Sequence, residues 1–289
     1  MNWKGVISAI TTPFKPDYSV DHAFLAEHAK WQLDNGVDGI VALGSLGEAA
    51  TLSFDEKVAI LNTLSKVMGG KPLVAGIASL STAEGIALVK AATEIGCSGA
   101  MVLPPYVYST DWREMKAHVS AIIGATPLSC MLYNNPPAYK TDFLAHHVAE
   151  LADRHPNLHA LKESSGDARR VTAVKALCGE RIAVFAGLDD MVLEGVRAGA
   201  VGWIAGLVNA LPRETMALFN KQSNSLYSWF LPLLRMDVVP KFVQLIKLVQ
   251  QEVGKGNERV RGPRLVLEGA EREEALSTIR AALASRPKL

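Results

Sequence analysis

The sequence predicts an α/β fold, a (βα)8 TIM barrel with a C-terminal helical extension. Short apolar runs alternate eight times with amphipathic segments, which is typical of parallel strands joined by helices. The runs are apolar almost throughout, as strands covered on both faces require. An open Rossmann-like sheet is the alternative, but the sequence has no Gly-x-Gly-x-x-Gly after its first run and no Gly-x-x-x-x-Gly-Lys-Ser/Thr phosphate loop.

The eight strand-helix units follow one another in chain order. We expect strands at residues 6–10, 39–43, 73–77, 99–103, 128–133, 158–162, 182–186 and 201–205. The helices that follow them are expected at residues 21–35, 54–68, 82–95, 110–123, 142–153, 168–177, 191–198 and 213–225. Ser53 and Glu56 form the capping-box pattern that starts the second helix.

The end of the chain is expected to form further helices at residues 226–234, 240–253 and 270–284. We therefore divide the chain into a barrel, residues 1–225, and C-terminal helices packed on it, residues 226–289. Because no low-complexity linker separates the two parts, we expect a single structural unit.

Composition excludes several classes of protein. Hydrophobic residues make up 49% of the chain and charged residues 20%, which allows a large core. The net charge is +1 and no basic stripe occurs, so a nucleic-acid partner is not expected. The sequence has neither an apolar run of about 18 residues nor a signal-peptide pattern, which predicts a cytoplasmic protein without a membrane span. Cys97, Cys130 and Cys178 lie far apart and are expected to be reduced thiols.

No metal site and no hydrolytic triad are expected. The seven histidines fall in helices, at helix ends or at the start of the sixth strand, without metal-ligand spacing. Asp189 and Asp190 follow the seventh strand, where capping of the next helix is the expected role. The strand ends supply no Ser/His/Asp or Cys/His set.

The candidate chemistry lies at the carboxyl ends of the strands, where barrel enzymes place their active sites. Lys162 is the only lysine at such an end, and burial there would lower its pKa so that a neutral amine can attack a carbonyl or imine. Tyr133 ends the neighbouring fifth strand, and its phenol can move the protons that Schiff-base chemistry needs. A solvated lysine and a merely packed tyrosine are the alternatives.

The second strand ends in Gly44-Ser45-Leu46-Gly47-Glu48. Glycines in such a loop let backbone N–H groups approach an anion, and a carboxylate is the expected guest. The alternative is an ordinary strand-to-helix turn with Glu48 as a cap.

Three motifs in this order resemble the dihydrodipicolinate synthase / N-acetylneuraminate lyase superfamily: Gly44-Ser45-x-Gly47-Glu48, Tyr133-Asn134-x-Pro136 and Lys162-Glu163-Ser164-Ser165-Gly166. The resemblance implies a class I (Schiff-base) enzyme acting on 2-keto acids or cyclic imine carboxylates, without a cofactor, as a homotetramer (dimer of dimers). It also implies roles for individual residues. Lys162 matches the Schiff-base lysine and Tyr133 the acid/base, while Ser45 acts in catalysis and forms the carboxylate cradle with the amide of Leu46. Gly187 and Ile204 match substrate-binding positions. Asn135 is a further candidate for substrate binding.

Three departures separate the chain from dihydrodipicolinate synthase itself. Leu46 stands where that enzyme carries a second threonine, Val107 where it carries an interface tyrosine, and Ala138 where it carries an arginine. Losing a guanidinium from a carboxylate site removes a contact worth at least about 1.5–3 kcal/mol. Tyr106 or Tyr108 is a possible substitute for the missing tyrosine.

Other stretches are similar to one branch, the Δ1-pyrroline-4-hydroxy-2-carboxylate deaminases of bacterial hydroxyproline degradation. These stretches are residues 133–136, 162–170, 199–209 and 237–241. The resemblance implies conversion of that cyclic imine to 2,5-dioxopentanoate and ammonia. The alternatives are a 2-keto-3-deoxy sugar acid aldolase or dehydratase, dihydrodipicolinate synthase, and a non-catalytic ligand-binding barrel.

Overall fold

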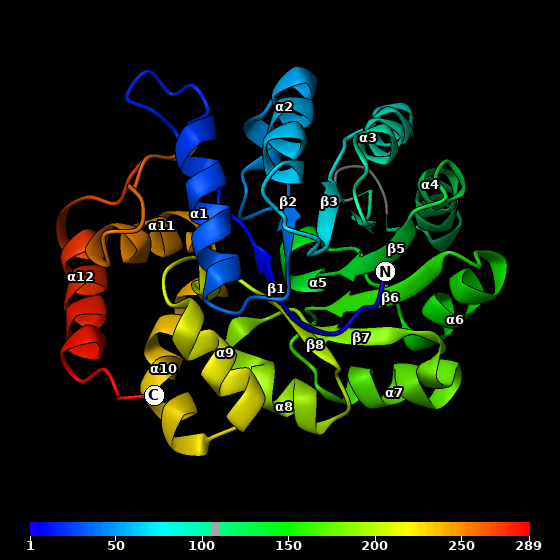
Figure 1. The fold of residues 1–289 in the computed structure, drawn as a ribbon. Helices are drawn as coiled ribbons and strands as arrows, with labels where there is room; N and C mark the ends of the chain where they lie inside the picture. The colour runs from blue at the N-terminus through cyan, green and yellow to red at the C-terminus, as the bar shows by residue number, and fades with distance from the viewer. Residues whose placement is uncertain (106–109) are drawn as a thin grey trace.

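The structure, a computed structural model, describes residues 1–105 and 110–289. Its eight parallel strands form a closed barrel in chain order, so the predicted fold is confirmed (Figure 1). The barrel closes where β1 pairs with β8, with Ile7 opposite Ile204. The strands are β1 (Gly5–Ala9), β2 (Gly39–Ala42), β3 (Leu73–Ile77), β4 (Gly99–Val102), β5 (Ser129–Asn134), β6 (Leu158–Glu163), β7 (Ala183–Ala186) and β8 (Gly202–Ala205).

The observed strands lie within one or two residues of the expected ones because both of their faces are covered. Every residue of β3 is buried, for example. At the amino-terminal end of the barrel, Trp3 meets Phe185 edge-on, with ring centroids 6.1 Å apart. Gly202 lies beside the Phe185 ring, where a Cβ would come within 2.2 Å of a ring carbon. A larger residue at position 202 would therefore displace the Phe185 ring and disturb its packing on Trp3.

Helices surround the barrel. They are α1 (His22–Asp34), α2 (Phe54–Ser65), α3 (Thr82–Ile95), α4 (Trp112–Gly124), α5 (Pro136–Tyr139), α6 (Ala145–Arg154), α7 (Arg169–Cys178), α8 (Val192–Arg197) and α9 (Pro212–Lys221). The capping box at the start of α2 is confirmed, since the Ser53 side chain accepts from the Glu56 amide and Glu56 accepts from the Ser53 amide.

The one-turn helix α5 was not expected. Asn135 caps it by accepting a hydrogen bond from the amide of Ala138, 3.2 Å away. Pro136 and Pro137 occupy its first turn, where a missing N–H costs nothing. The helix therefore begins directly after β5 and carries Tyr139 to the barrel mouth.

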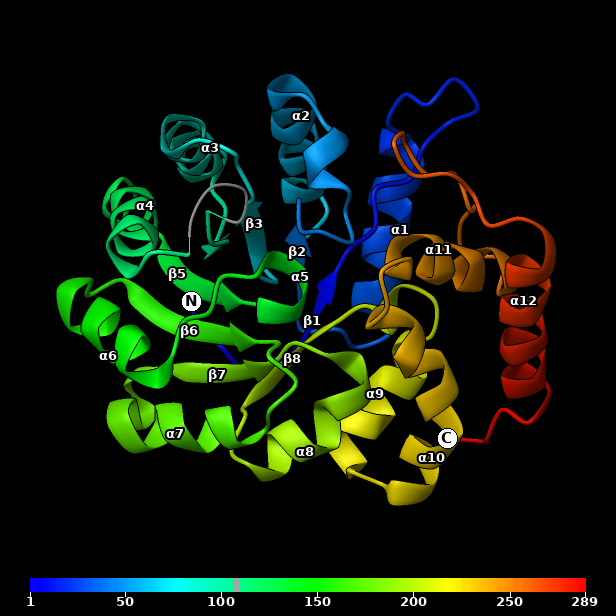
Figure 2. The ribbon, with the colours of Figure 1, turned by 180° about the vertical axis from the view of Figure 1, so that it is seen from behind.

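The C-terminal helices lie on the side toward which the strands point (Figures 1 and 2). They are α10 (Asn224–Leu234), α11 (Phe242–Glu252) and α12 (Gly269–Ala284), with the short 3₁₀ helix η5 (Arg235–Asp237) between α10 and α11. Trp229 in α10 donates to the carbonyl of Ala282 in α12, 2.9 Å away. The division at residues 225 and 226 stays a prediction.

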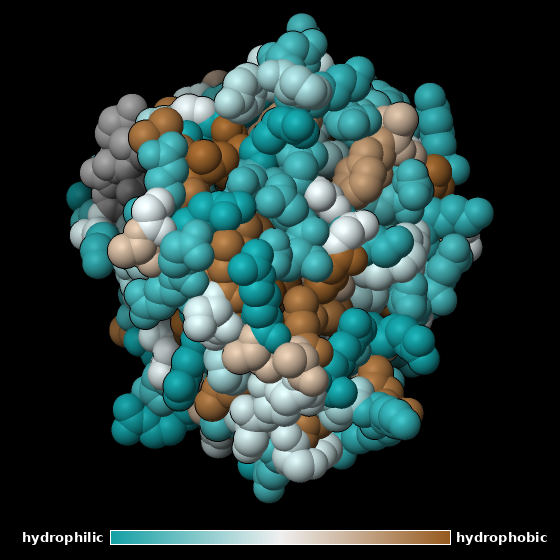
Figure 3. Space-filling model, turned by 90° about the vertical axis from the view of Figure 1, so that its left-hand side faces the viewer, coloured by the Kyte–Doolittle hydropathy of each residue, from teal (hydrophilic) through white to brown (hydrophobic). Residues whose placement is uncertain are grey.

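The surface at the carboxyl ends of the strands combines apolar and polar residues. In Figure 3, hydrophobic residues gather in the middle of this face and hydrophilic ones surround them. Among the described residues, no helix is long and apolar enough to cross a membrane.

Candidate active site

Lys162 lies near the end of β6 and its side chain is only 7% exposed. Burial lowers the pKa of Lys162 from 10.5 to about 8, although the negative charges of Asp237 and Asp189 act in the opposite direction. A substantial fraction of a lysine with such a pKa is neutral near pH 7–8, and only the neutral amine is a nucleophile.

Tyr133 lies directly opposite Lys162 in the β5–β6 pair, as the sequence predicts for neighbouring strands. The Lys162 Nζ is 4.2 Å from the centroid of the Tyr133 ring. Burial raises the pKa of Tyr133 to about 12, and hydrogen bonds that include those with Asn135 and Tyr139 partly offset this rise. The phenol is therefore protonated at neutral pH and can give up its proton before it accepts one.

Asn135 holds the phenol from the other side. Its Nδ2 donates to the Tyr133 hydroxyl over 2.9 Å, while its Oδ1 accepts the amide of Ala138. Both polar ends of this side chain are therefore engaged within the protein. Asn135 lines the cavity, as expected for a substrate-binding residue. Its hydrogen bonds, however, indicate that it orients the Tyr133 phenol.

Ser45 forms a hydrogen bond with the hydroxyl of Tyr139, not with Tyr133. Tyr139 in turn meets Tyr133 edge-on, with centroids 5.8 Å apart and an interplanar angle of 89°. The three hydroxyls of Ser45, Tyr139 and Tyr133 therefore form one cluster beside Lys162. Tyr139 was not expected at the site, because a residue that follows Pro-Pro ordinarily lies in a loop.

The loop that carries Ser45 and Leu46 is held from below by a buried ion pair. Glu48 Oε1 lies 2.5 Å from Nζ of Lys247 in α11, and both side chains are at most 2% exposed. Lys247 also donates to the carbonyl of Arg259 over 2.6 Å, and Glu48 Oε2 accepts the amide of Arg261 over 3.0 Å. Glu48 has a left-handed backbone with a φ of 57°, and its side chain caps no helix.

The cradle and the remaining predicted residues line one cavity of about 680 Å³. Ser45, Leu46, Tyr133, Asn135, Lys162, Gly187 and Ile204 all contribute to its wall. At Gly187 a Cβ would come within 2.9 Å of Cγ of Lys162 and 2.0 Å of Oγ of Ser164, so any side chain there would displace the lysine. The structure thus brings together all the predicted site residues.

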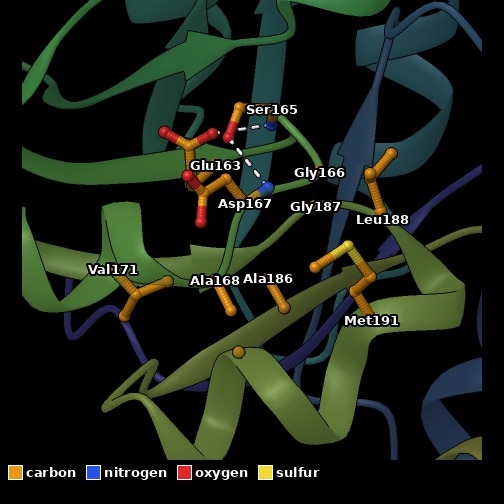
Figure 4. Close-up of a pocket in the computed structure, with 11 residues that line it drawn as sticks. Glu163, Ser165, Gly166, Asp167, Ala168, Val171, Ala186, Gly187, Leu188 and Met191 are labelled. Carbon is orange, nitrogen blue, oxygen red and sulfur yellow. Dashed lines mark hydrogen bonds between the residues drawn. The ribbon is translucent and has the colours of Figure 1, made fainter.

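Glu163 follows Lys162 and faces the opposite side of the strand, toward the outer helices. Its carboxylate accepts from Asn134 Nδ2 over 3.1 Å and from the amide of Ser165 over 2.7 Å. Figure 4 shows this side, where Glu163, Ser165 and Asp167 lie above a small pocket lined by Val171 and other apolar residues. The pocket holds about 20 Å³, which is room for about one water, and the hydrogen bonds here fix the turn after Lys162.

Asp189 does not cap the helix that follows it, contrary to expectation. Its carboxylate is fully buried and accepts hydrogen bonds from the amides of Gly206 and Leu207 and from Nε1 of Trp203, at 2.8–3.1 Å. These donors follow or belong to β8. Asp189 therefore ties the ends of β7 and β8 together beside the cavity.

The C-terminal segment adds two charged residues that were not expected at the site. Asp237 of η5 and Arg264 both line the cavity. Neither residue follows a barrel strand, so the expectation that site residues lie at the carboxyl ends of strands does not select them. Tyr106, Val107 and Tyr108 lie outside the described residues. Within the described residues, no group of three or more His, Cys, Asp or Glu side chains could hold a metal ion.

Comparison with known proteins places this geometry in a family. A model of the Dihydrodipicolinate synthetase family matches residues 2–282. A 4-hydroxy-tetrahydrodipicolinate synthase of Geotalea daltonii is 31% identical over 287 residues, which cover 96% of this chain and 98% of that one. One from Geobacter metallireducens is 36% identical over 217 residues, covering 75% and 74%.

Solved structures give the same result. The crystal structure of a dihydrodipicolinate synthase from Bacillus anthracis superposes with a TM-score of 0.92 at 28% identity, covering 100% of both chains. A monomeric dihydrodipicolinate synthase variant superposes with a TM-score of 0.90 at 25% identity, covering 98% of this chain and 96% of that one. The chain therefore belongs to the dihydrodipicolinate synthetase family and is an enzyme of the lyase superfamily that includes N-acetylneuraminate lyase.

Proposed function

We propose that this enzyme is a Schiff-base-forming deaminase, which converts Δ1-pyrroline-4-hydroxy-2-carboxylate and water to 2,5-dioxopentanoate and ammonia. The observation that carries the proposal is the contact of Lys162 with Tyr133 in a cavity whose wall is uncharged at Leu46 and Ala138. Such a wall suits a compact cyclic imine with one carboxylate. The motif resemblance described above supplies the choice of substrate.

In the first step, Nζ of Lys162 bonds to C2 of the cyclic imine. The C2–N ring bond then breaks, its electron pair goes to the nitrogen, and the nitrogen takes up a proton. An open-chain amine is left attached through an iminium to Lys162. The substrate carboxylate rests against Ser45 and the amide of Leu46, which donates to no other group in the described part of the chain.

In the second step, the iminium withdraws electrons and acidifies C3. Tyr133 passes its own proton through Tyr139 and Ser45 to the C4 hydroxyl, which leaves as water, and Tyr133 takes the C3 proton. The product tautomerises to an imine at C5, which water hydrolyses to release ammonia. A further water hydrolyses the lysine iminium, so one water is consumed overall. No cofactor is needed because the lysine iminium accepts the electrons.

We further propose that the enzyme acts in the cytoplasm as a homotetramer, a dimer of dimers. The family resemblance supports this assembly. One relative is described as a monomeric variant, so a monomer is the alternative assembly. Size-exclusion chromatography with light scattering measures the mass of the particle and tests the tetramer.

The second candidate function is 4-hydroxy-tetrahydrodipicolinate synthase, the name that the relatives carry. Arg264 favours it, because a guanidinium on the cavity wall can bind the carboxylate of a second substrate. Ala138 weighs against it, since the α5 position expected to carry that arginine is uncharged. A keto-deoxy sugar acid would need hydrogen bonds to its distal hydroxyls. Asn135 is poorly placed to supply them, because its polar atoms already bind Tyr133 and Ala138.

An activity panel separates these candidates. The purified enzyme is given Δ1-pyrroline-4-hydroxy-2-carboxylate, 2-keto-3-deoxy sugar acids, or pyruvate with aspartate semialdehyde. Ammonia and 2,5-dioxopentanoate from the first substrate are expected. Consumption of pyruvate and aspartate semialdehyde without ammonia release from the imine would replace the deaminase by the synthase.

A further inference from the structure

The carboxyl group of Asp237 enters the barrel mouth from the C-terminal segment. It packs against the strand end at Gly206 so closely that a Cβ on Gly206 would come within 2.1 Å of its Oδ1. Asp237 lines the same cavity as Lys162 and Ile204. It also acts electrostatically on Lys162, and each carboxyl of the Asp189–Asp190 pair acts on it in turn.

Asp237 differs from its neighbour Asp189 because no residue that the structure describes donates a hydrogen bond to it. Trp203 and two backbone amides satisfy Asp189. Within the described residues, no hydrogen bond or ion pair reaches the Asp237 side chain, and Arg264 on the same wall forms none with it. Burial and the charge of Asp189 raise the pKa of Asp237 well above its usual value. A half-buried carboxyl of this kind gains most from a cationic donor.

We propose that Asp237 binds the nitrogen of the substrate, first as the N–H of the protonated cyclic imine and then as the ammonium that ring opening produces. This inference rests on the proposed function. Lys162 must be a neutral amine when it attacks C2, so at that step the protonated nitrogen of the substrate is the cation that can pair with this carboxyl. Asp189 and Asp190 add negative charge nearby, which favours a cation over a neutral hydroxyl at this point.

A nitrogen subsite at Asp237 would make the enzyme select keto acids that carry a basic nitrogen. A ligand with a basic nitrogen three carbons from its keto carbon, or cyclised onto it, places that nitrogen at Asp237. Pyruvate reaches Lys162 and the Ser45 cradle but has no group for Asp237. A keto-deoxy sugar acid offers only hydroxyls at this position, and their hydrogen bonds to a carboxylate are weaker than those of a cation.

The test compares two ligands on one variant. Calorimetry measures the Kd of pyruvate and of Δ1-pyrroline-2-carboxylate, which has the ring nitrogen but no 4-hydroxyl, for the wild type and for Asp237→Asn. We expect the Kd of the pyrroline to rise about 10- to 100-fold and that of pyruvate to change less than about threefold. Any change in the ionisation of Lys162 affects the binding of both ligands. The ratio of the pyrroline Kd to the pyruvate Kd therefore reports the contribution of the ligand nitrogen alone.

Two further variants serve as controls. Asp237→Glu keeps the charge and is expected to keep the Kd ratio within about threefold of the wild type. Asp190→Asn removes one negative charge from the same cavity wall without removing the carboxyl proposed to touch the nitrogen, and it should change the ratio clearly less than Asp237→Asn does. An equal change in the ratio for Asp190→Asn and Asp237→Asn, or an unchanged ratio for Asp237→Asn, would overturn the proposal. Retained pyruvate binding shows that each variant is folded.

The outcome is separable from that of the proposed function. If the wild type releases ammonia from the 4-hydroxy imine but Asp237→Asn leaves the Kd ratio unchanged, the nitrogen subsite fails alone. If no ammonia is released while Asp237→Asn still raises the Kd of the pyrroline relative to that of pyruvate, the deaminase assignment fails and the subsite is retained for another nitrogen-bearing substrate.

Discussion

At the scale of the residue, Lys162 carries the charge state on which the proposed reaction depends. Its pKa of about 8 predicts that pyruvate is trapped by borohydride faster as the pH rises from 6 to 9, with a midpoint near 8. Lys162→Arg should give no adduct, because a guanidinium stays protonated. Mass spectrometry of the trapped protein measures both. A pH-independent rate would contradict the depressed pKa.

The hydroxyl cluster gives a second prediction at this scale. Tyr133→Phe should lower kcat by about 10²–10⁴, the usual contribution of a general acid/base. Tyr139→Phe and Ser45→Ala should each lower it by about tenfold or more, and the double variant should be scarcely worse than the worse single one, because the two hydroxyls act in one path. Additive losses in kcat would show that Ser45 and Tyr139 act separately.

At the scale of the element, α11 fixes the loop of the carboxylate cradle through Lys247 and Glu48. Breaking one side of a buried ion pair leaves an unpaired charge and costs about 3–5 kcal/mol. We expect Lys247→Met to lower the free energy of unfolding in urea by about that amount. Glu48→Gln combined with Lys247→Met should recover much of the loss, since neither charge is then left alone. Failure of the double variant to recover stability would mean that the pair matters for packing instead.

At the scale of the whole molecule, Lys162, Tyr133, Tyr139 and Ser45 all belong to one chain. We therefore expect activity per chain to stay constant when the proposed tetramer is diluted until it dissociates. Light scattering gives the mass, and the initial rate at each dilution gives the activity. A fall in activity that follows dissociation would show that a neighbouring chain completes the site.

The barrel and the position of the proposed nucleophile were predictable because both depend on local pattern. Apolar runs mark the strands, and the rule that sites lie at strand ends then selects Lys162 and Tyr133. Tyr139 and Asp237 were not predictable in this way. The first lies on a single helical turn formed by a Pro-Pro pair and an Asn cap. The second reaches the cavity from a helix pair whose docking depends on contacts distant in sequence, which no periodicity in the chain reveals.

The bond between Glu48 and Lys247 also has a consequence for the order in which the protein is made. The two residues are 199 positions apart, and chains are synthesised from the amino terminus. On the ribosome, Ser45 and Leu46 emerge long before the lysine that will hold their loop in place. During that interval Glu48 is a carboxylate without its buried partner. The loop of Ser45 and Leu46 therefore gains its buried ion pair only after all eight strands have been made, and a chain that stops before α11 has the barrel sequence without this support.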